Sequence, residues 1–379
     1  MTKSTQKLQI IIFLSFIALF FVLNLALPDK EFSEQENRYL QTVPSFSLQA
    51  LFAGRYTTDF EAYTTDQFAS RDTWTSLKAR SELFVGKQEN NDVYYCRSDA
   101  LPGGTALIER FIAPSDEALD TGLAALSKLR ENVDCPVYLA LIPGSAEIWN
   151  DSLPSNAPHD SERAVIDYVY ARADAETVDM YGTLAPHAGE YIFYRTDHHW
   201  TSLGAYYGYT ALMEAMGLTA SPLSAYEPVT VSDDFYGTIH SKSGFSWHSP
   251  DTMQTFVEPP PGLSVTSYPE GAPEVSALYD EAALATKDKY GFFLGGNSPL
   301  VQIETGQMDA PALLILRDSY ADSLVPFLLG DFSEIHLFDL RYNRTSLAAY
   351  VQEHDFDSIL VCYSVPNFCT DANLFLMGR

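Results

Sequence analysis

The sequence predicts an α/β protein in which an N-terminal membrane-spanning helix precedes a three-layer domain built on a parallel sheet. Three observations indicate this class. A run of about twenty mostly apolar residues, Leu8 to Leu27, lies near the N-terminus. Short apolar runs alternate with helix-compatible segments in the C-terminal part, an order that favours parallel strands joined by right-handed crossovers. The 379 residues are 46% hydrophobic, which is enough to build a packed core.

The run from Leu8 to Leu27 has the length needed to cross a hydrocarbon core as a helix. Lys3 and Lys7 precede it, whereas the segment after it is dominated by acidic residues, namely Asp29, Glu31, Glu34 and Glu36. The positive-inside rule therefore predicts a cytoplasmic N-terminus, with everything after Pro28 outside the cytoplasm. A cleaved signal peptide is the alternative, but its hydrophobic region is usually shorter, and no small-x-small cleavage site surrounds Ala26. We expect a retained single-pass anchor.

We expect three parts in the chain: a cytoplasmic tip and anchor over residues 1–28, a helical lead-in over 29–100, and an α/β domain over 101–379. Apolar and aromatic residues at helical spacing from Thr58 to Val85, broken near Gln67 to Arg71, indicate the lead-in. Within the domain, residues from about 219 to 290 are rich in Pro, Ser and Gly, which predicts an irregular insertion across one face.

Strands of the domain are expected at short apolar runs bounded by turn residues, and helices at the segments between them. The predicted strands are Val137–Ile142, Tyr191–Tyr194, Ala312–Leu316, Ile335–Leu340 and Ser358–Tyr363. The predicted helices are Ser161–Ala171, Thr201 or Ser202 to about Met216, Tyr320–Leu329 and Ser346–Glu353. The segment Arg195 to Trp200 then lies on a strand-to-helix turn.

The composition limits the classes of partner. A formal net charge of −27 would repel phosphate backbones and anionic head groups, so nucleic acid is not an expected partner. The four cysteines fit no metal-ligand spacing, and they do not make a disulfide scaffold in so long a chain, although one or two disulfides are permitted; they are Cys96, Cys135, Cys362 and Cys369. No cofactor and no metal ion are expected.

Two predicted strand ends carry reactive side chains. Arg195 to Thr201 (RTDHHWT) follows one strand, and Arg317 to Tyr320 (RDSY) follows another. Ligands of open α/β sheets bind at the carboxyl ends of strands. A serine hydroxyl becomes a nucleophile when an imidazole takes its proton and a carboxylate orients that imidazole. We expect Ser319 as nucleophile, His199 as base and Asp197 as the orienting acid, and Ser319 also precedes a helix whose N-terminal field is positive.

Asp197 and His199 belong to a string, Tyr194 to Thr201 (YRTDHHWT), that resembles the signature of the DHHW family of bacterial cell-surface proteins. Further matches extend over almost the whole chain: Glu34-x-Glu36-Asn37-Arg38, Phe235-x-Gly237-Thr238, Ser241-Lys242-Ser243-Gly244, Gly295-Gly296-Asn297, Asp318-Ser319-Tyr320 and Leu340-Arg341-Tyr342. The family is similar to the alginate O-acetyltransferase type of SGNH-hydrolase-like enzymes. Position 317 is Arg where Lys is expected to be commoner, so a cation is kept with a different geometry.

The resemblance implies an SGNH-like, flavodoxin-like fold and a serine-dependent transfer of acetyl groups to a cell-surface or secreted polysaccharide. By that likeness Asp197 pairs with His199, and both serve Ser319. The resemblance also implies a membrane partner that supplies acyl groups. Two alternatives stay open: an acetyl esterase on the same fold, in which water is the acceptor, and a non-catalytic surface protein that binds glycans.

Other residues receive supporting roles. Asn297 and the Ser319 backbone amide are the expected oxyanion donors, unless Gly295-Gly296-Asn297 is a plain turn. Trp200, Arg317, Lys242 and Tyr320 are the expected substrate contacts, with a core position as the alternative for Trp200 and an ordinary loop as the alternative for Lys242.

Three further alternatives concern the reactive turns themselves. His198 is expected to be structural or to line the cleft. Neighbouring side chains on an extended segment point opposite ways, which makes joint binding of one metal ion by His198 and His199 awkward. Asp318 is the alternative triad acid, but its side chain is expected to point away from that of Ser319.

Overall fold

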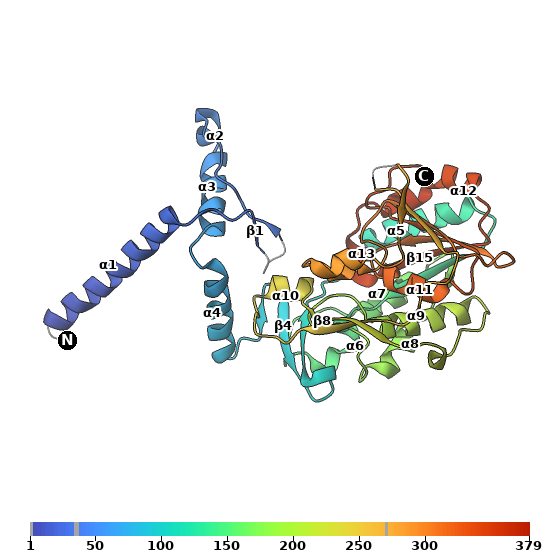
Figure 1. The fold of residues 1–379 in the computed structure, drawn as a ribbon, viewed down its shortest axis with the longest axis horizontal. Coiled ribbons are helices and arrows are strands. Elements are labelled where there is room, and N and C mark those ends of the chain that lie inside the picture. Colours follow the sequence, from blue (N-terminus) through green and yellow to red (C-terminus); the bar gives the residue numbers. More distant parts are fainter. Residues whose placement is uncertain (1–2, 34–37, 270–271) are drawn as a thin grey trace. The chain divides into compact units, whose positions relative to one another are not determined.

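The computed structural model describes residues 3–33, 38–269 and 272–379. It divides into a smaller unit, the chain up to Lys87 together with Gly244–Trp247, and a larger unit, Gln88–Ser243 together with His248–Arg379. Figure 1 gives the element labels. Residues 88–100 were expected in the helical lead-in, whereas in the structure they lie in the larger unit. The segment Glu34 to Asn37, part of the family resemblance, lies outside the described residues.

The smaller unit consists mainly of helices. Its elements are α1 (Lys3–Ala26), β1 (Phe32–Ser33), β2 (Arg38–Tyr39), α2 (Leu48–Phe52), α3 (Arg55–Asp66) and α4 (Arg71–Phe84). Helix α1 is long and apolar enough to cross a membrane, with a mean hydropathy of 2.6, and this fits membrane anchoring. Helices α3 and α4 separate at residues 67–70, where the helical spacing of the sequence is interrupted.

An eight-stranded sheet forms the centre of the larger unit, in the order β11-β10-β12-β14-β13-β15-β6-β7. The strands are β6 (Val137–Ile142), β7 (Glu176–Thr177), β10 (Ser264–Ser267), β11 (Glu274–Ser276), β12 (Leu300–Glu304), β13 (Ala312–Arg317), β14 (Glu334–Phe338) and β15 (Ser358–Ser364). The five strands from β14 to β7 run parallel, and β12, β10 and β11 continue the sheet in antiparallel pairing. The expected parallel sheet is therefore confirmed as the core of a mixed sheet.

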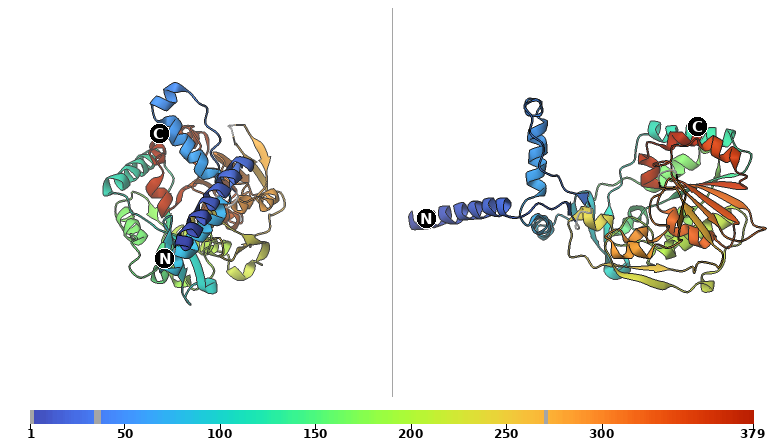
Figure 2. Two further views of the ribbon diagram at one scale, coloured as in Figure 1. Left: turned by 90° about the vertical axis from the view of Figure 1, so that its left-hand side faces the viewer. Right: turned by 45° about the horizontal axis from the view of Figure 1, so that its top comes forward.

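Helices cover both faces of this sheet, which makes three layers (Figures 1 and 2). Leu313 and Ile315 of β13 pack in one hydrophobic cluster with residues of α9 (Ser202–Ala215) and α11 (Ala321–Leu328). Leu314 and Leu316 face the other way, in a second cluster. The helices on this second face are α5 (Asp116–Glu131), α7 (Glu162–Tyr170), α12 (Leu347–Glu353) and α13 (Val365–Thr370). Alternate side chains of one strand thus pack into the hydrophobic clusters on opposite faces of the sheet, as expected when both faces are covered.

Smaller elements surround the sheet. The strands are β3 (Glu89–Asn90), β4 (Val93–Arg97) and β5 (Thr105–Glu109), which form one antiparallel sheet, and β8 (Val229–Phe235) and β9 (Asp251–Thr255), which pair with each other. The short α-helices are α6 (Ser145–Ile148), α8 (Met180–Leu184) and α10 (Thr238–Ser243). The 3₁₀ helices are Pro102–Gly104, Asn150–Ser152, Ala185–His187, Leu223–Ala225, Glu281–Ala285, Lys289–Phe292 and Leu374–Gly378. All four cysteines are free thiols.

One prediction about local structure was wrong. Tyr191–Tyr194 forms no strand and makes only a single bridge, from Phe193 to Trp200, because the chain turns back on itself at this point. The loop-rich segment 219–290 also contributes regular elements, namely β8 and β9 as a pair and β10 and β11 in the large sheet. Backbone hydrogen bonding to β12 outweighs weak strand propensity there.

Candidate functional site

A histidine and a serine that are far apart in sequence meet at the carboxyl edge of the sheet. Strand β13 ends at Arg317, and Ser319 follows just before α11. His199 lies on the turn that precedes α9. The distance between His199 Nε2 and Ser319 Oγ is 2.8 Å, although 120 residues separate them. The fold thus brings the two reactive turns together.

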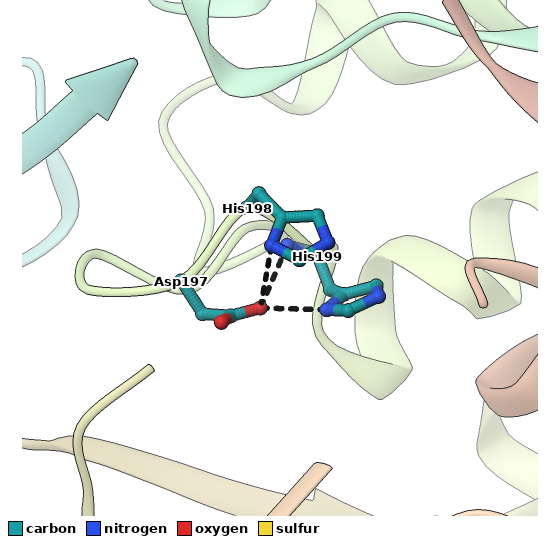
Figure 3. A group of neighbouring side chains, drawn as sticks. All are labelled: Asp197, His198 and His199. Atoms are coloured by element: carbon teal, nitrogen blue, oxygen red, sulfur yellow. Dashed lines mark hydrogen bonds and ion pairs between the residues drawn. The ribbon is translucent and has the colours of Figure 1, made fainter. Parts of the chain in front are cut away.

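Asp197 extends this contact into a chain of three side chains. Its Oδ1 lies 2.6 Å from His199 Nδ1 and also accepts the His199 backbone N–H at 3.0 Å. Figure 3 shows the Asp197 carboxylate beside the two imidazoles of His198 and His199. Because an ionised carboxylate only accepts, we assign the His199 proton to Nδ1, which leaves Nε2 to accept from the Ser319 hydroxyl.

The second oxygen of Asp197 is fixed by the start of α10. Asp197 Oδ2 accepts from the Thr238 backbone N–H at 2.8 Å and from the Thr238 hydroxyl at 3.0 Å. A Cβ on Gly237 would lie 2.2 Å from Asp197 Oδ2, so only glycine leaves room for the carboxylate here. This contact explains why glycine precedes threonine in the Phe235-x-Gly237-Thr238 string.

Burial determines the charge states of this pair. Burial and, to a smaller extent, the neighbouring His198 together lower the pKa of His199 to about 4, although the Asp197 carboxylate opposes both. Burial alone would raise the pKa of Asp197, but the two histidines and the hydrogen bonds hold it below its usual range. Near neutral pH the pair is therefore an ionised Asp197 and a neutral His199, the state in which an imidazole can accept a proton.

Asp251, at the start of β9, holds the turn that carries His199. Its side chain is fully buried. Asp251 Oδ1 accepts from the Tyr191 hydroxyl at 2.6 Å and from the backbone N and Nε of Arg195 at 3.1 and 3.0 Å. Asp251 Oδ2 accepts from the backbone N and hydroxyl of Thr196 at 2.8 and 2.5 Å. Five hydrogen bonds to one carboxylate explain the sharp reversal of the chain between residues 191 and 200.

Asp318 holds the turn that carries Ser319 (the serine turn, Arg317 to Tyr320), as Asp251 holds the turn that carries His199. Its Oδ1 accepts from the Tyr320 backbone N–H at 3.0 Å. Its Oδ2 accepts from the backbone N and hydroxyl of Ser364, both at 2.8 Å, and from Asn367 Nδ2 at 2.7 Å. Asp318 therefore ties β13 to the end of β15, whereas the carboxylate that binds His199 is that of Asp197. Ser364 and Asn367 were missed, although they directly follow a predicted strand at this same edge.

Tyr290, which no sequence pattern singles out, completes the surroundings of His199. The ring of Tyr290 is stacked on the His199 imidazole, with centroids 3.7 Å apart. Its hydroxyl donates to the Ser319 carbonyl oxygen at 3.2 Å and lies 3.0 Å from Ser323 Oγ. Tyr290 comes from the segment 219–290, where no local pattern distinguishes it from a core aromatic.

Two of the expected substrate contacts are out of reach of a ligand. Trp200 is fully buried, and its indole Nε1 donates to the Tyr320 carbonyl at 3.0 Å and to Ser323 Oγ at 2.9 Å. Arg317 is also fully buried, with Nη1 2.9 Å from Asp322 Oδ1 and 3.9 Å from Asp339 Oδ2. Both side chains are buried and bind groups of the protein rather than a ligand, so the expectation of substrate contact is corrected for both.

The other three expected site residues, Tyr320, Lys242 and Asn297, differ in exposure and in the groups that they contact. Tyr320 is almost fully buried and its hydroxyl donates to the His198 carbonyl oxygen. Lys242 is partly exposed and forms an ion pair with Glu109, at 2.6 Å. Asn297 is exposed, and its Oδ1 accepts from Arg341 Nη2 at 3.2 Å. No contact that the structure describes joins Asn297 to Ser319, so its oxyanion role stays a prediction.

A cavity of about 660 Å³ opens beside the two turns. Its wall includes His198, Tyr320 and Thr238 from the reactive turns and their supports, and Asn367 from α13, which follows β15. Lys242 lies in the same wall. A substrate bound in this cavity would therefore lie next to the serine turn.

Asp197, His198 and His199 are also the described residues that could hold a metal ion, since their donor atoms lie within 4.8 Å of one another. The hydrogen bonds use the same atoms. His199 has Asp197 on Nδ1 and Ser319 on Nε2, and His198 Nδ1 lies 2.7 Å from the Thr238 hydroxyl. A metal ion would have to displace these partners, so the donor atoms of this group serve hydrogen bonds in the described structure.

Comparisons with known proteins agree with this fold. A protein-family model described as DHHW protein matches residues 117–338. The solved structure of a DHHW family protein from Eubacterium siraeum is 22% identical, with a TM-score of 0.64, and the alignment covers 77% of this chain and 96% of that one. Bacillus cereus PatB1 with a sulfonyl adduct is 20% identical, with a TM-score of 0.61 and coverage of 76% and 99%.

A more distant match is the O-acetyltransferase domain of Pseudomonas putida AlgJ, at 16% identity, a TM-score of 0.44 and coverage of 74% and 92%. A similarity of that size supports no argument about this chain. No curated protein matches the sequence.

Proposed function

The chain belongs to the DHHW protein family, and from that premise and the geometry of its site we propose that it is a serine-dependent acyltransferase that O-acetylates a cell-surface or secreted polysaccharide. The observation that carries the proposal is the hydrogen-bonded chain from Asp197 through His199 to Ser319, with distances of 2.6 and 2.8 Å. Both are within the range in which a base can take a proton.

In the proposed first half-reaction, Ser319 Oγ attacks the carbonyl carbon of an acetyl ester or thioester donor. His199 Nε2 takes the serine proton as the new carbon–oxygen bond forms, and Asp197 stabilises the resulting imidazolium. The bond from the carbonyl carbon to the leaving group then breaks, and His199 returns the proton to that group. The product is an acetyl ester on Ser319.

In the second half-reaction, a sugar hydroxyl attacks the acetyl-enzyme and gives its proton to His199. The bond between the acetyl carbon and Ser319 Oγ breaks, and the serine recovers the proton. The developing oxyanion requires hydrogen-bond donors. The Ser319 backbone N–H suits this task, because it donates to no acceptor among the described residues; Asn297 is the second proposed donor. With water in place of the sugar, the same steps make the protein an esterase.

We also propose that α1 anchors the protein with its larger unit outside the cytoplasm. Lys3 and Lys7 precede the apolar helix, and acidic residues follow it, which supports that orientation. A membrane protein that passes acetyl groups across the bilayer is the partner that this placement would suit. Protease added to intact cells should then degrade the larger unit, and protection in intact cells with loss on lysis would contradict the orientation.

The test is Ser319→Ala against the matched variant Ser127→Ala, on helix α5. Turnover of an aryl acetate and labelling by a fluorophosphonate should fall to background in Ser319→Ala and stay at the wild-type level in Ser127→Ala. A sulfonyl fluoride is a second reagent, since PatB1 is known with a sulfonyl adduct. Equal labelling of wild-type and Ser319→Ala would disprove the nucleophile. Mass increments on oligosaccharides then distinguish transfer from hydrolysis.

A further inference from the structure

The cavity beside the serine turn has a wall in which charges are paired with one another. Arg110 Nη1 lies 3.8 Å from Asp92 Oδ1, and Lys242 Nζ lies 2.6 Å from Glu109 Oε1. All four residues line the cavity. An anionic ligand would have to compete with a carboxylate for each of these two cations.

A third carboxyl group of the wall, Glu162, has a different environment. It is 1% exposed, at the start of α7, and its Oε2 accepts from the Gly144 backbone N–H at 2.7 Å. Burial raises the pKa of Glu162 to about 8, against the effect of this hydrogen bond. Near neutral pH the group is mainly a neutral acid, which can both donate and accept.

The charges of Arg110, Asp92, Lys242, Glu109 and Glu162 therefore add up to about zero at neutral pH. The chain as a whole carries a formal charge of −27. An anion that approaches the cavity meets the repulsion of the whole protein and finds a carboxylate beside each of the two wall cations, Arg110 and Lys242. A neutral ligand meets neither penalty.

The remaining wall suits a ligand with many hydroxyl groups. Ser145 and Asn367 supply small polar groups, whereas Phe111 and Ile112 supply apolar surface. The hydroxyls of Thr238 and Ser364 also line the wall, but they donate to Asp197 and Asp318. Sugar rings combine hydroxyl edges with apolar faces, and sites of this size place a few polar groups in a mainly apolar lining.

Accordingly, we infer that this cavity is the acceptor subsite, and that it takes an uncharged, hydroxyl-rich glycan segment rather than one carrying uronate or phosphate groups. The inference rests on the proposed acyl transfer, whose acceptor it specifies. It predicts discrimination by charge, because a carboxylate on the acceptor would face Glu109 and Asp92 across the cavity.

The experiment uses the full-length protein in detergent with an aryl acetate as donor. The acceptors are two oligosaccharides of matched length, a neutral hexose oligomer and a uronic acid oligomer, with acetylated product followed by mass. We expect at least about tenfold more transfer to the neutral oligomer at low salt. Titration of Ser319→Ala with the same oligomers should show the same preference in binding, without any turnover.

Two variants test the role of the wall charges. Glu109→Gln releases Lys242, so the ratio of uronate to neutral transfer should rise about tenfold. Glu117→Gln, exposed on α5, removes the same charge outside the cavity and should leave that ratio at the wild-type value. An equal change in both variants would overturn the assignment, because total charge alone would then explain it.

The other outcomes separate this inference from the function on which it rests. Preference of the wild-type protein for the uronate oligomer would overturn the inference while acyl transfer stands. Aryl acetate turnover with transfer to water alone would overturn the acceptor subsite and leave an esterase. Absence of both Ser319 labelling and aryl acetate turnover would overturn the proposed function itself.

Discussion

The Tyr290 ring lies parallel to the His199 imidazole, at 7° between planes and 3.7 Å between centroids, while its hydroxyl bonds the carbonyl oxygen of Ser319. One side chain therefore touches both the proposed base and the backbone of the proposed nucleophile. Its role is positional, because its hydroxyl points at the backbone rather than at the reacting atoms.

Substitution of Tyr290 should separate these two contacts. Tyr290→Phe keeps the stack and loses the hydroxyl's hydrogen bonds to the Ser319 carbonyl oxygen and Ser323 Oγ, so the aryl acetate kcat should fall about fivefold. Tyr290→Leu removes the stack, and a displaced imidazole should lower kcat about 100-fold. Fluorophosphonate labelling rates should follow the same order. Equal losses in both variants would show that the stack contributes nothing to positioning.

The pH dependence of acylation should reflect the buried state of His199. Only the neutral imidazole can accept the serine proton, and the pKa of His199 is lowered to about 4, so acylation should stay constant from about pH 6 to 8 and fall only near pH 4. His198→Asn removes a neighbouring imidazole that depresses this pKa, so its acid limb should move to higher pH. Stopped-flow burst rates measure the acid limb in the wild-type protein and in His198→Asn. An unshifted acid limb in His198→Asn would contradict the assignment of this limb to His199.

Gly237→Ala should disable the site through Asp197. The added Cβ would lie 2.2 Å from Asp197 Oδ2, so the carboxylate has to move away from its bonds to Thr238. We expect about a 100-fold loss of kcat. Gly189→Ala is the matched control, since a Cβ at Gly189 meets nothing within 4 Å. Wild-type kcat in Gly237→Ala would mean that the carboxylate tolerates the shift.

Asp251→Asn should destabilise the fold as well as the site. An amide at this position leaves several donors of the turn without an acceptor and removes the partner of Arg195, so we expect a loss of about 3 kcal/mol or more in the free energy of unfolding. Denaturant unfolding measures it. Asp233→Asn, exposed on β8, controls for loss of charge and should change stability by less than about 0.5 kcal/mol.

Much of the sheet could be predicted because its strands are short apolar runs between turns. Val137–Ile142 is β6 at the predicted bounds, and the runs at Ala312 and Ser358 became β13 and β15. The antiparallel edge could not be predicted, since β10 and β11 are polar strands within a Pro-rich segment. Their pairing depends on the neighbouring strand β12 rather than on their own residues.

The residues of the proposed catalytic chain could be selected from the sequence, whereas most of the residues that support them could not. Asp197, His199 and Ser319 come from strings of reactive residue types at strand ends, and the structure brings them within hydrogen-bonding distance. Asp251 and Tyr290 are single residues in a segment without a clear pattern, and only the tertiary fold carries them to the site. Trp200 and Arg317 were expected to contact a ligand because both are large side chains with hydrogen-bond donors beside a reactive turn. Such side chains can equally well be buried and donate to groups of the protein itself, as they do here.

The order of strands in the large sheet has a consequence for biosynthesis. Strand β6 ends at Ile142 and pairs on one side with β15, which begins only at Ser358. A nascent chain thus carries an unsatisfied inner strand until more than two hundred further residues have followed it. Under the outward orientation proposed above, the proposed serine centre can form only after β15 has been translocated, which keeps any acyl-transfer chemistry away from the metabolites of the cytoplasm.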